Sequence, residues 1–437
     1  MASIVVVGGG IAGLTCAWQL RRQGHDVEVL DRAAQPGGRL IAEVRHGFSV
    51  DRGARFISGN HPDLQNLLGD LDLADRVYSP SPTVAAVQRR GVLHPTGPLR
   101  LWVSRLLSPT ARARLPLLAF HVLRSASGLN PRRADHAAQL ERRDRVDLVT
   151  GMRPIAGDEN LEFLIAPAFA SAFDCEPEDL SFAFGLRALK QRARGSRPQS
   201  LRGGLGHLAE ALASRVLVRV DCEVTSVETE TDGARVRYRI RGRPGSVVAD
   251  AVVVAVAGCR VAPLCAKLTP AEQGFFEQVR YVRGIRAHLC FETAPAIPVF
   301  TDVMFPRSEG VELYGLRQGH RQMGAAPPGG SLLTATLTAP AAKRLWRADD
   351  AEVSGFVTEQ LASSPIGQLA PDECIVHRSD ALRPLFPAGQ LSRLARFLAR
   401  MDRSPRLAFA GNYLVDPTLE GSVSSGMRAA AEVSESL

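Results

Sequence analysis

The alternation of apolar and polar positions at the start of the chain predicts a strand, a helix and a second strand in succession. Residues 4–7 form a short apolar run, and residues 14–23 have the spacing of a helix that ends at Gly24. Residues 25–30 then alternate like a strand that ends at Asp31. This βαβ unit is typical of a nucleotide-binding α/β domain.

Two later stretches return to the same α/β character. Residues 215–242 alternate like strands around a turn at Asp232 and Gly233, and residues 251–259 form an apolar run that predicts a buried strand. Residues 406–414 predict a last strand. We therefore expect one nucleotide-binding domain that is assembled from segments far apart in the sequence.

The remaining stretches have a different pattern. Residues 76–197 are helical in pattern with proline breaks. Residues 283–399 mix predicted strands, near 288–291 and 332–337, with predicted helices, near 351–361 and 391–398. A chain of 437 residues commonly folds as two domains. We predict two interleaved domains, the nucleotide-binding domain from residues 1–75, 198–282 and 400–437, and a second domain from residues 76–197 and 283–399.

The composition is that of a globular chain, with 45% hydrophobic and 22% charged residues. The seven cysteines are scattered and lack metal-binding spacing, which predicts buried thiols in a reducing compartment and no metal site. The chain begins on a strand without a basic leader, and its longest apolar run is too short to span a membrane. We therefore expect a cytoplasmic protein.

The net charge of +8 comes mainly from arginines, which gather in residues 105–145 and 187–202. An excess of this kind attracts anionic partners. No aromatic platform or recognised motif accompanies the charge, so we expect no nucleic-acid partner. Two interpretations stay open. The arginines either lie on solvated faces of an arginine-rich chain or form a surface that contacts a membrane or an acidic substrate.

The motif Gly8-x-Gly10-x-x-Gly13 follows the first predicted strand and opens the first predicted helix. Gly8 permits the tight turn, Gly10 lets the backbone approach a pyrophosphate, and Gly13 lets the helix pack closely on the strand. The helix N-terminus supplies unpaired amide donors to the phosphate charge. Asp31 is spaced to accept hydrogen bonds from a ribose diol.

A second glycine pair follows in RAAQPGGRL, residues 32–40, and GFSVDRGARFI, residues 47–57, comes next. At this point the sequence resembles the flavin amine oxidase superfamily, which includes monoamine oxidases, protoporphyrinogen oxidases, phytoene-type carotenoid desaturases and hydroxysqualene dehydroxylase. The resemblance implies FAD as cofactor. It also implies an α/β fold, in which a Rossmann-like FAD-binding domain of the GR2 type, as in p-hydroxybenzoate hydroxylase, is interleaved with an α+β substrate domain.

The resemblance also implies which residues hold FAD. The PGGR element would run beside the flavin and its pyrophosphate, the D-x-G element would pass near the isoalloxazine ring, and one later strand would present its backbone to the adenine. With the first motif, the implied residues are Gly8, Gly10, Ile11, Ala12, Gly13, Asp31, Arg32, Gly37, Gly38, Arg39, Leu40, Gly53, Ala54, Arg55 and Val224.

The closing stretch GNYLVDPTLEGSVSSG, residues 411–426, resembles the second flavin-facing element of the family. Its first part would meet the ribityl chain or pyrophosphate, and its second part would open a helix whose positive end faces the flavin's pyrimidine edge. A glycine and an acid at a helix start also fit simple capping, which stays open. The implied residues are Gly411, Asn412, Glu420, Gly421, Ser422 and Val423.

Two positions depart from the monoamine oxidase pattern. Thr418 stands where those enzymes place an aromatic residue that aligns an amine, and RGIRAHLCF offers Arg286 or His288 where they carry a lysine near flavin N5. Arg383 interrupts an A-L-P-like stretch that precedes the last strand in relatives. The closing motif has no cysteine, so we expect non-covalent FAD. The catalytic candidates are Arg55, His288 and Arg286, and a structural role for each stays open.

These features favour an FAD-dependent oxidoreductase that takes a hydride from a small, largely hydrophobic substrate at a C–C or C–N bond, as desaturases and protoporphyrinogen oxidases do. Oxygen or another acceptor would reoxidise the flavin. The alternatives are an amine or amino-acid oxidase of secondary metabolism, and a non-redox flavin enzyme or prenyl-binding protein of the same fold. The leucines and arginines of residues 102–145 fit either peripheral membrane contact or a helical subdomain whose apolar face packs inward.

Overall fold

The computed structural model describes the chain except residues 55, 80–83, 98–99, 126–128, 194–197, 299, 319–324, 401 and 403. Its first sheet consists of five parallel strands in the order β10-β2-β1-β14-β20. These strands are β1 (Ser3–Val7), β2 (Asp26–Leu30), β10 (Leu217–Arg219), β14 (Ala251–Val254) and β20 (Leu407–Phe409). The apolar runs of the sequence thus become neighbours in one buried sheet.

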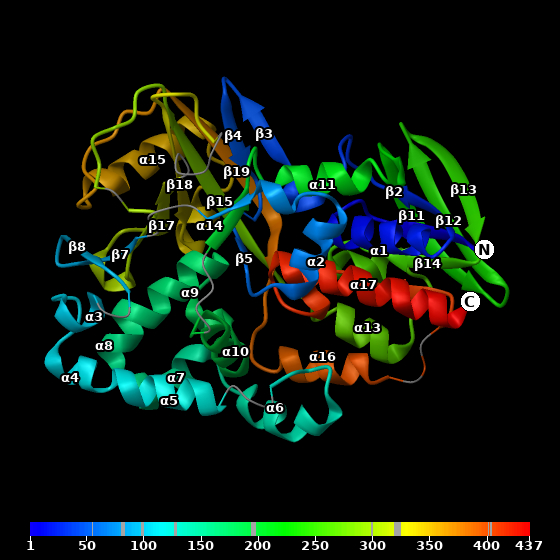
Figure 1. The fold of residues 1–437 in the computed structure, drawn as a ribbon, viewed down its shortest axis with the longest axis horizontal. Helices are drawn as coiled ribbons and strands as arrows, with labels where there is room; N and C mark the ends of the chain where they lie inside the picture. The colour runs from blue at the N-terminus through cyan, green and yellow to red at the C-terminus, as the bar shows by residue number, and fades with distance from the viewer. Residues whose placement is uncertain are drawn as a thin grey trace.

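Two helices from opposite ends of the chain pack together beside this sheet (Figure 1). They are α1 (Ile11–Arg22) and α17 (Leu419–Ser436). A Cβ on Gly426 would lie 2.4 Å from the Ala12 carbonyl oxygen, so glycine lets the two backbones approach. Helix α17 begins at Leu419, so residues 419–426 of the closing stretch form its first turns.

Smaller elements surround the five-stranded sheet. A three-stranded antiparallel sheet lies at the right in Figure 1, near both chain termini. Its first turn lies at residues 231–232, one residue before the predicted position, and Gly233 already belongs to a strand. The elements are β11 (Cys222–Glu230), β12 (Gly233–Ile240), β13 (Arg243–Ala249), the helices α2 (Pro62–Asp70), α11 (Gly206–Ala213), α12 (Val261–Leu264) and α13 (Pro270–Phe276), and the short strands β5 (Ile57–Ser58), β6 (Val77–Tyr78) and β9 (Pro198–Leu201).

A seven-stranded sheet in the order β19-β15-β18-β17-β16-β7-β8 forms the centre of the second region. Its strands are β7 (Ala85–Arg89), β8 (Val92–Pro95), β15 (Tyr281–Phe291), β16 (Asp302–Met304), β17 (Leu313–Gln318), β18 (Ser331–Leu337) and β19 (Glu373–Pro384). The hairpin of β3 (Ala42–Arg45) and β4 (Phe48–Asp51) packs on this sheet through Phe48 and Val50.

Strands β7 and β8 correct the prediction of helices throughout residues 76–197. They are joined by Arg90 and Gly91, which both have positive φ, as the commonest two-residue hairpin turns require. The proline breaks of this stretch hid that hairpin signal in the sequence. The strands predicted near residues 288–291 and 332–337 are present as β15 and β18, although β15 begins at Tyr281, well before the predicted start. The helices predicted near 351–361 and 391–398 are present with ends that differ by at most one residue.

Helices cover the lower end of the second region in Figure 1. They are α3 (Arg100–Val103), α4 (Pro109–Ala113), α5 (Leu115–Ser125), α6 (Ala137–Arg143), α7 (Leu148–Ala156), α8 (Asp158–Asn160), α9 (Ala166–Phe173), α10 (Phe182–Ala193) and α16 (Gln390–Leu398), while α14 (Ala339–Arg344) and α15 (Asp350–Ala362) flank the sheet. Among the described residues, no helix is both long and apolar enough to cross a membrane.

Candidate functional site

Two glycine loops lie against each other at the start of α1. The amide of Gly37 donates to the Gly9 carbonyl at 2.7 Å, and Gly37 forms an isolated parallel bridge with Gly10. Gly38 has a φ of +60°, and a Cβ there would lie 3.1 Å from the Gly10 Cα. The structure therefore brings the first motif and the PGGR element, some 27 residues later, into direct contact.

The glycines of the first motif differ in what surrounds them. A Cβ on Gly13 would lie 2.0 Å from the Gly8 carbonyl oxygen, so Gly13 is required by the turn itself. A Cβ on Gly10 would meet nothing within 4 Å. Gly10 therefore borders open space at the amino end of α1, where unpaired amide groups and the helix dipole favour an anion. This cradle fits the pyrophosphate of a dinucleotide.

Asp31 is buried at the end of β2, and its carboxylate binds the backbone of the glycine loop. It accepts hydrogen bonds from the Gly9 amide at 2.5 Å and from the Ala33 amide at 2.8 Å. A Cβ on Gly9 would lie 2.6 Å from Asp31 Oδ2, so Gly9 is needed for this contact. The sequence motif gave no role to Gly9, and the ribose contact of Asp31 stays a prediction.

The PGGR element also meets the closing motif. Arg39 donates from Nη2 to Asn412 Oδ1 at 2.9 Å, which joins residues 373 positions apart in the sequence. Gly411, one residue earlier, donates its amide to Ser425 Oγ at 2.8 Å. The neutral amide oxygen of Asn412 is an adequate acceptor for the Arg39 guanidinium. Both predicted sides of the cofactor site are thus tied to each other by side chains.

The N-terminus of α17 is capped by Thr418, whose hydroxyl accepts a hydrogen bond from the Gly421 amide at 3.2 Å. The same hydroxyl donates to Asp416 Oδ1. Glu420 caps the neighbouring helix α2, because its carboxylate accepts the amides of Asp63 at 3.1 Å and Leu64 at 2.9 Å. Burial raises the pKa of Glu420. Glu420 therefore caps α2, and the Gly421 amide is capped by Thr418. Both contacts are independent of any contact with a flavin.

A buried cluster of charges links the second region to the two loops just described. Asp174 lies at the C-terminus of α9 and accepts a hydrogen bond from Arg286 Nη2 at 2.7 Å and from Arg383 Nη2 at 3.3 Å. Arg286 and Asp174 side chains are each 2% exposed. Arg286 also donates to the Gly53 carbonyl at 2.9 Å, and Arg383 donates to the Pro417 carbonyl at 2.9 Å. The cluster therefore holds the loop at Gly53 and the loop before α17.

These contacts give structural roles to two arginines that the sequence left ambiguous. Arg286 was a catalytic candidate, and its guanidinium is committed to Asp174 and to the backbone around Gly53. Arg383, which interrupts the A-L-P-like stretch, is the second cation on Asp174. Asp174 itself was missed, because no spacing in the sequence marks a partner 112 residues away.

His288, the other described catalytic candidate, belongs to a chain of hydrogen bonds under the β3-β4 hairpin. Its Nδ1 lies 3.0 Å from Thr334 Oγ1, and its Nε2 lies 3.1 Å from His377 Nδ1. His377 Nε2 lies 3.1 Å from a carboxylate oxygen of Glu43, which is also paired with Arg52. This series of hydrogen bonds thus runs from a buried strand to the surface of the hairpin.

The histidine in the middle of this hydrogen-bond series, His377, predicts that the folded protein loses stability on mild acidification. Burial lowers the pKa of His377 below its unfolded value of about 6.5, so the unfolded chain takes up the proton more readily. Stability should therefore be constant above pH ~6.5 and fall as the pH drops below it. We expect urea unfolding at pH ~7.5 and ~5.5 to show a larger loss for the wild type than for His377→Gln. Equal losses in the two proteins would contradict this origin.

Three residues remain, which are the predicted Arg55 and Val224 and a neighbour of the predicted Asn412. Arg55 lies outside the described residues. Val224 lies in β11 beside a register shift, with its side chain half-buried. Tyr413, which follows Asn412, is 1% exposed and packs against Phe276 in the core, so it is a core residue. The cofactor roles of the predicted residues stay predictions, although the structure brings most of them to one place.

Comparison with known proteins decides the family. The model of the family described as "Flavin containing amine oxidoreductase" matches residues 11–434. The chain belongs to this family. The match confirms the resemblance and the predicted class of flavin-containing oxidoreductases, with a flavin as the family's cofactor.

Individual relatives vary in how much of the chain they cover. Coproporphyrinogen III oxidase of Mycobacterium tuberculosis (strain ATCC 25618 / H37Rv) is 26% identical and covers 100% of this chain and 98% of its own length. Protoporphyrinogen oxidase 2 of Arabidopsis thaliana is 27% identical over 41% of this chain, and the match spans only 34% of that protein.

Solved structures share the fold. A putative protoporphyrinogen oxidase from Exiguobacterium sp. 255-15 has a TM-score of 0.78 at 20% identity and covers 100% of this chain and 99% of its own. Wild-type putrescine oxidase bound to putrescine has a TM-score of 0.79 at 17% identity and covers 99% of each chain. These neighbours confirm the predicted fold class, a Rossmann-like FAD-binding region with a substrate region.

Proposed function

We propose that the protein holds FAD non-covalently and oxidises a small, largely hydrophobic substrate of the porphyrinogen or desaturase type, by hydride removal at a C–C or C–N bond. The observation that carries the proposal is the role of Thr418. Its side chain is occupied in capping α17, and this position has no aromatic ring to align an amine. The full-length likeness to a coproporphyrinogen III oxidase supports the same choice.

The residues present fit the cofactor. The open space at Gly10 and the amino end of α1 would receive the pyrophosphate, and Arg39 with Asn412 would border the chain that leads to the ring. When bound, the flavin accepts the hydride. The N-terminus of α17 would place the positive end of its dipole toward developing negative charge.

The protein's own side chains would position the substrate and exclude water. Arg286 and Arg383 would hold the Gly53 and Pro417 backbones through their common anion Asp174. Neither arginine is offered as a proton acceptor, because a guanidinium stays protonated in proteins. Orientation of the substrate C–H bond and exclusion of water are the contributions we assign to this frame.

A panel of reductants tests the proposal. Under anaerobic conditions, coproporphyrinogen III or protoporphyrinogen IX should bleach the bound flavin, whereas putrescine and other primary amines should leave it oxidised. Release of free flavin on denaturation without protease would confirm non-covalent binding. Rapid bleaching by a primary amine would overturn the argument from Thr418, and a protein that stays colourless after addition of FAD would overturn the proposal as a whole.

A further inference from the structure

Helix α5 has apolar side chains on two opposite faces. Leu118 and Val122 are buried and belong to a large hydrophobic core that includes Leu148 of α7. Leu117, Phe120 and Leu123 are 59%, 62% and 51% exposed, and their spacing of three residues places them together on the other face. A helix that is apolar all round is normally covered on every side. We call the exposed group of Leu117, Phe120, Leu123 and the arginines beside it, Arg114 and Arg124, the α5 patch.

The exposure of the side chains in residues 102–145 bears on the two interpretations that the sequence left open. Leu106 and Leu107 do pack inward, at 0% and 1% exposure. The outer residues of α5 do not, and on α3, whose Trp102 carbonyl accepts a hydrogen bond from Arg112 of α4, Trp102 and Val103 are 48% and 81% exposed as well. Large exposed apolar side chains that gather in one part of a surface mark interaction sites.

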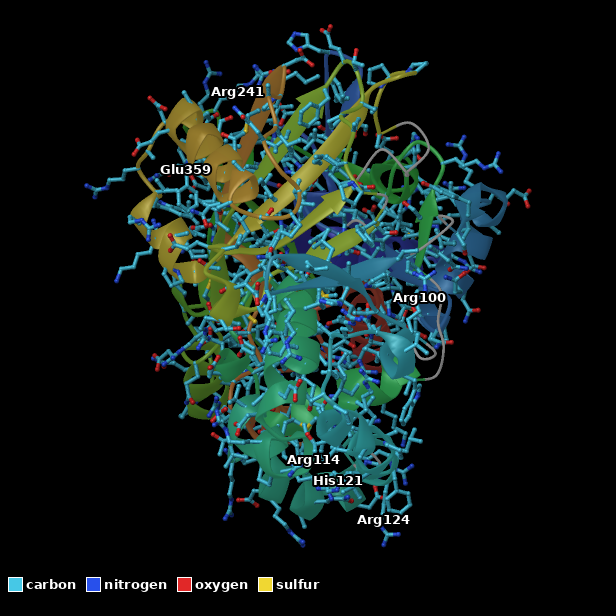
Figure 2. All side chains as sticks on the ribbon, turned by 90° about the vertical axis from the view of Figure 1, so that its left-hand side faces the viewer. Arg100, Arg114, His121, Arg124, Arg241 and Glu359 are labelled. Atoms are coloured by element: carbon cyan, nitrogen blue, oxygen red, sulfur yellow. The ribbon has the colours of Figure 1, made fainter. Side chains whose placement is uncertain are left out.

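The sequence that carries the patch has charge of one sign. Between positions 100 and 134 the sequence has seven arginines and neither aspartate nor glutamate. Among the described residues, Arg114 and Arg124 form no ion pair, and both reach the tip of the molecule beside His121 in Figure 2. An unpaired basic rim around apolar side chains complements a surface that offers anions over an apolar layer.

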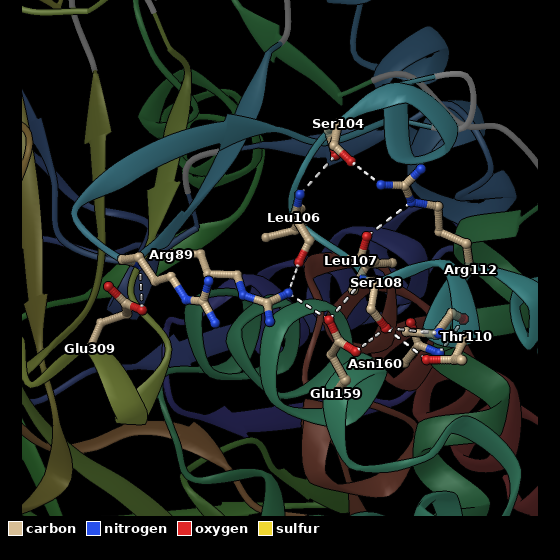
Figure 3. A network of polar contacts seen from close by, with 12 residues as sticks. Arg89, Ser104, Leu106, Leu107, Ser108, Thr110, Arg112, Glu159, Asn160 and Glu309 are labelled. Carbon is tan, nitrogen blue, oxygen red and sulfur yellow. Dashed lines mark hydrogen bonds and ion pairs between the residues drawn. The ribbon is translucent and has the colours of Figure 1, made fainter.

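A network of polar contacts fixes the segment that precedes the α5 patch (Figure 3). Glu159 accepts hydrogen bonds from Arg89 at 2.6 Å and from the Ser108 amide at 2.8 Å, which fixes the start of α4. Arg112 donates to the Leu107 carbonyl at 3.0 Å and to the Ser104 carbonyl at 2.8 Å, which fixes the turn after α3. The segment before α5 is thus fixed by contacts within the protein. The outward direction of the patch itself follows from the burial of Leu118 and Val122 on the other face of α5.

We propose that the α5 patch is a docking surface for an anionic lipid bilayer, with Leu117, Phe120 and Leu123 entering the interface and Arg114 and Arg124 meeting lipid phosphates. The patch lies at the end of the helical region, away from the five-stranded sheet (Figure 1). Docking through it leaves the glycine loops clear of the bilayer. The attraction combines buried apolar surface with charge, and it weakens as salt increases.

Vesicle flotation of the full-length, FAD-loaded protein tests this surface. The protein should float with vesicles of phosphatidylcholine and phosphatidylglycerol, and it should float poorly with pure phosphatidylcholine or in high salt. The double variant Leu117→Asp/Phe120→Asp should bind at least about tenfold less, because two charges would enter the apolar interface. The double variant Arg114→Gln/Arg124→Gln should lose the preference for anionic vesicles.

The matched control is Val248→Asp, which changes a side chain of similar exposure, 58%, on β13 at the opposite end of the molecule. It should float like the wild type. All variants should keep the flavin spectrum and the melting temperature of the wild type. Failure of the wild type to float would overturn the proposal. Equal losses in the α5 and Val248 variants would also overturn it, as would self-association that the α5 variants abolish without any vesicle binding.

Discussion

Replacement of Asp174 by asparagine is expected to lower the free energy of unfolding by about 3–5 kcal/mol, because it removes the only carboxylate that the described residues place on both Arg286 and Arg383. A buried guanidinium without its anion retains the full cost of losing water. Asparagine keeps the shape of the side chain. It also tolerates the left-handed conformation of residue 174, where φ is +56°. The loss thus reports the charge alone.

The same variant should hold FAD less tightly, since the loops at Gly53 and Pro417 would lose their common anchor. Urea unfolding of the apoprotein measures the first effect, and titration of the apoprotein with FAD measures the second. Asp158→Asn is the control, because Asp158 pairs with Arg153 at the surface with side chains 81% and 59% exposed. Such a pair contributes little. A stability change as small in Asp174→Asn as in this control would contradict the role given to the cluster.

The parts of the fold that were predictable from sequence are those with local causes. The first strand, helix and second strand follow from the spacing of apolar residues within some thirty positions. The spacing of Gly8, Gly10 and Gly13 predicts the turn between the first strand and the helix. The hairpin at Arg90 and Gly91 was also local, but neighbouring prolines suggested a broken helix instead. The prediction was wrong here because the hairpin turn and the prolines give opposite indications within the same short stretch of sequence.

The parts that were unpredictable depend on partners far along the chain. Nothing near Asp174 indicates two arginines more than a hundred residues later. Glu420 was expected to serve its own helix or a flavin, whereas it caps α2, which lies over 350 residues earlier. In both cases a charged side chain pairs with hydrogen-bond donors that tertiary packing brings to it from far along the sequence. Only the structure shows which donors these are.

Two single-methyl substitutions should separate folding from cofactor binding in the glycine motif. Gly10→Ala should leave the apoprotein's stability unchanged within about 0.5 kcal/mol, because Gly10 has a φ of −75° and its added Cβ would meet nothing within 4 Å. The methyl group would occupy the space assigned to the pyrophosphate. We therefore expect FAD affinity to fall roughly 10- to 100-fold, as an overpacking cost of about 1–3 kcal/mol implies.

Gly13→Ala should behave in the opposite way and destabilise the apoprotein itself by about 1–3 kcal/mol or more, because its Cβ would lie 2.0 Å from the Gly8 carbonyl oxygen. Thermal unfolding of both apoproteins and titration of each with FAD distinguish the two residues. If Gly10→Ala bound FAD as tightly as the wild type, the pyrophosphate would lie elsewhere, and the assignment of this cradle would be wrong. If Gly13→Ala were as stable as the wild type, the helix would be free to shift away from β1, and the close packing seen at this turn would not be a requirement of the fold.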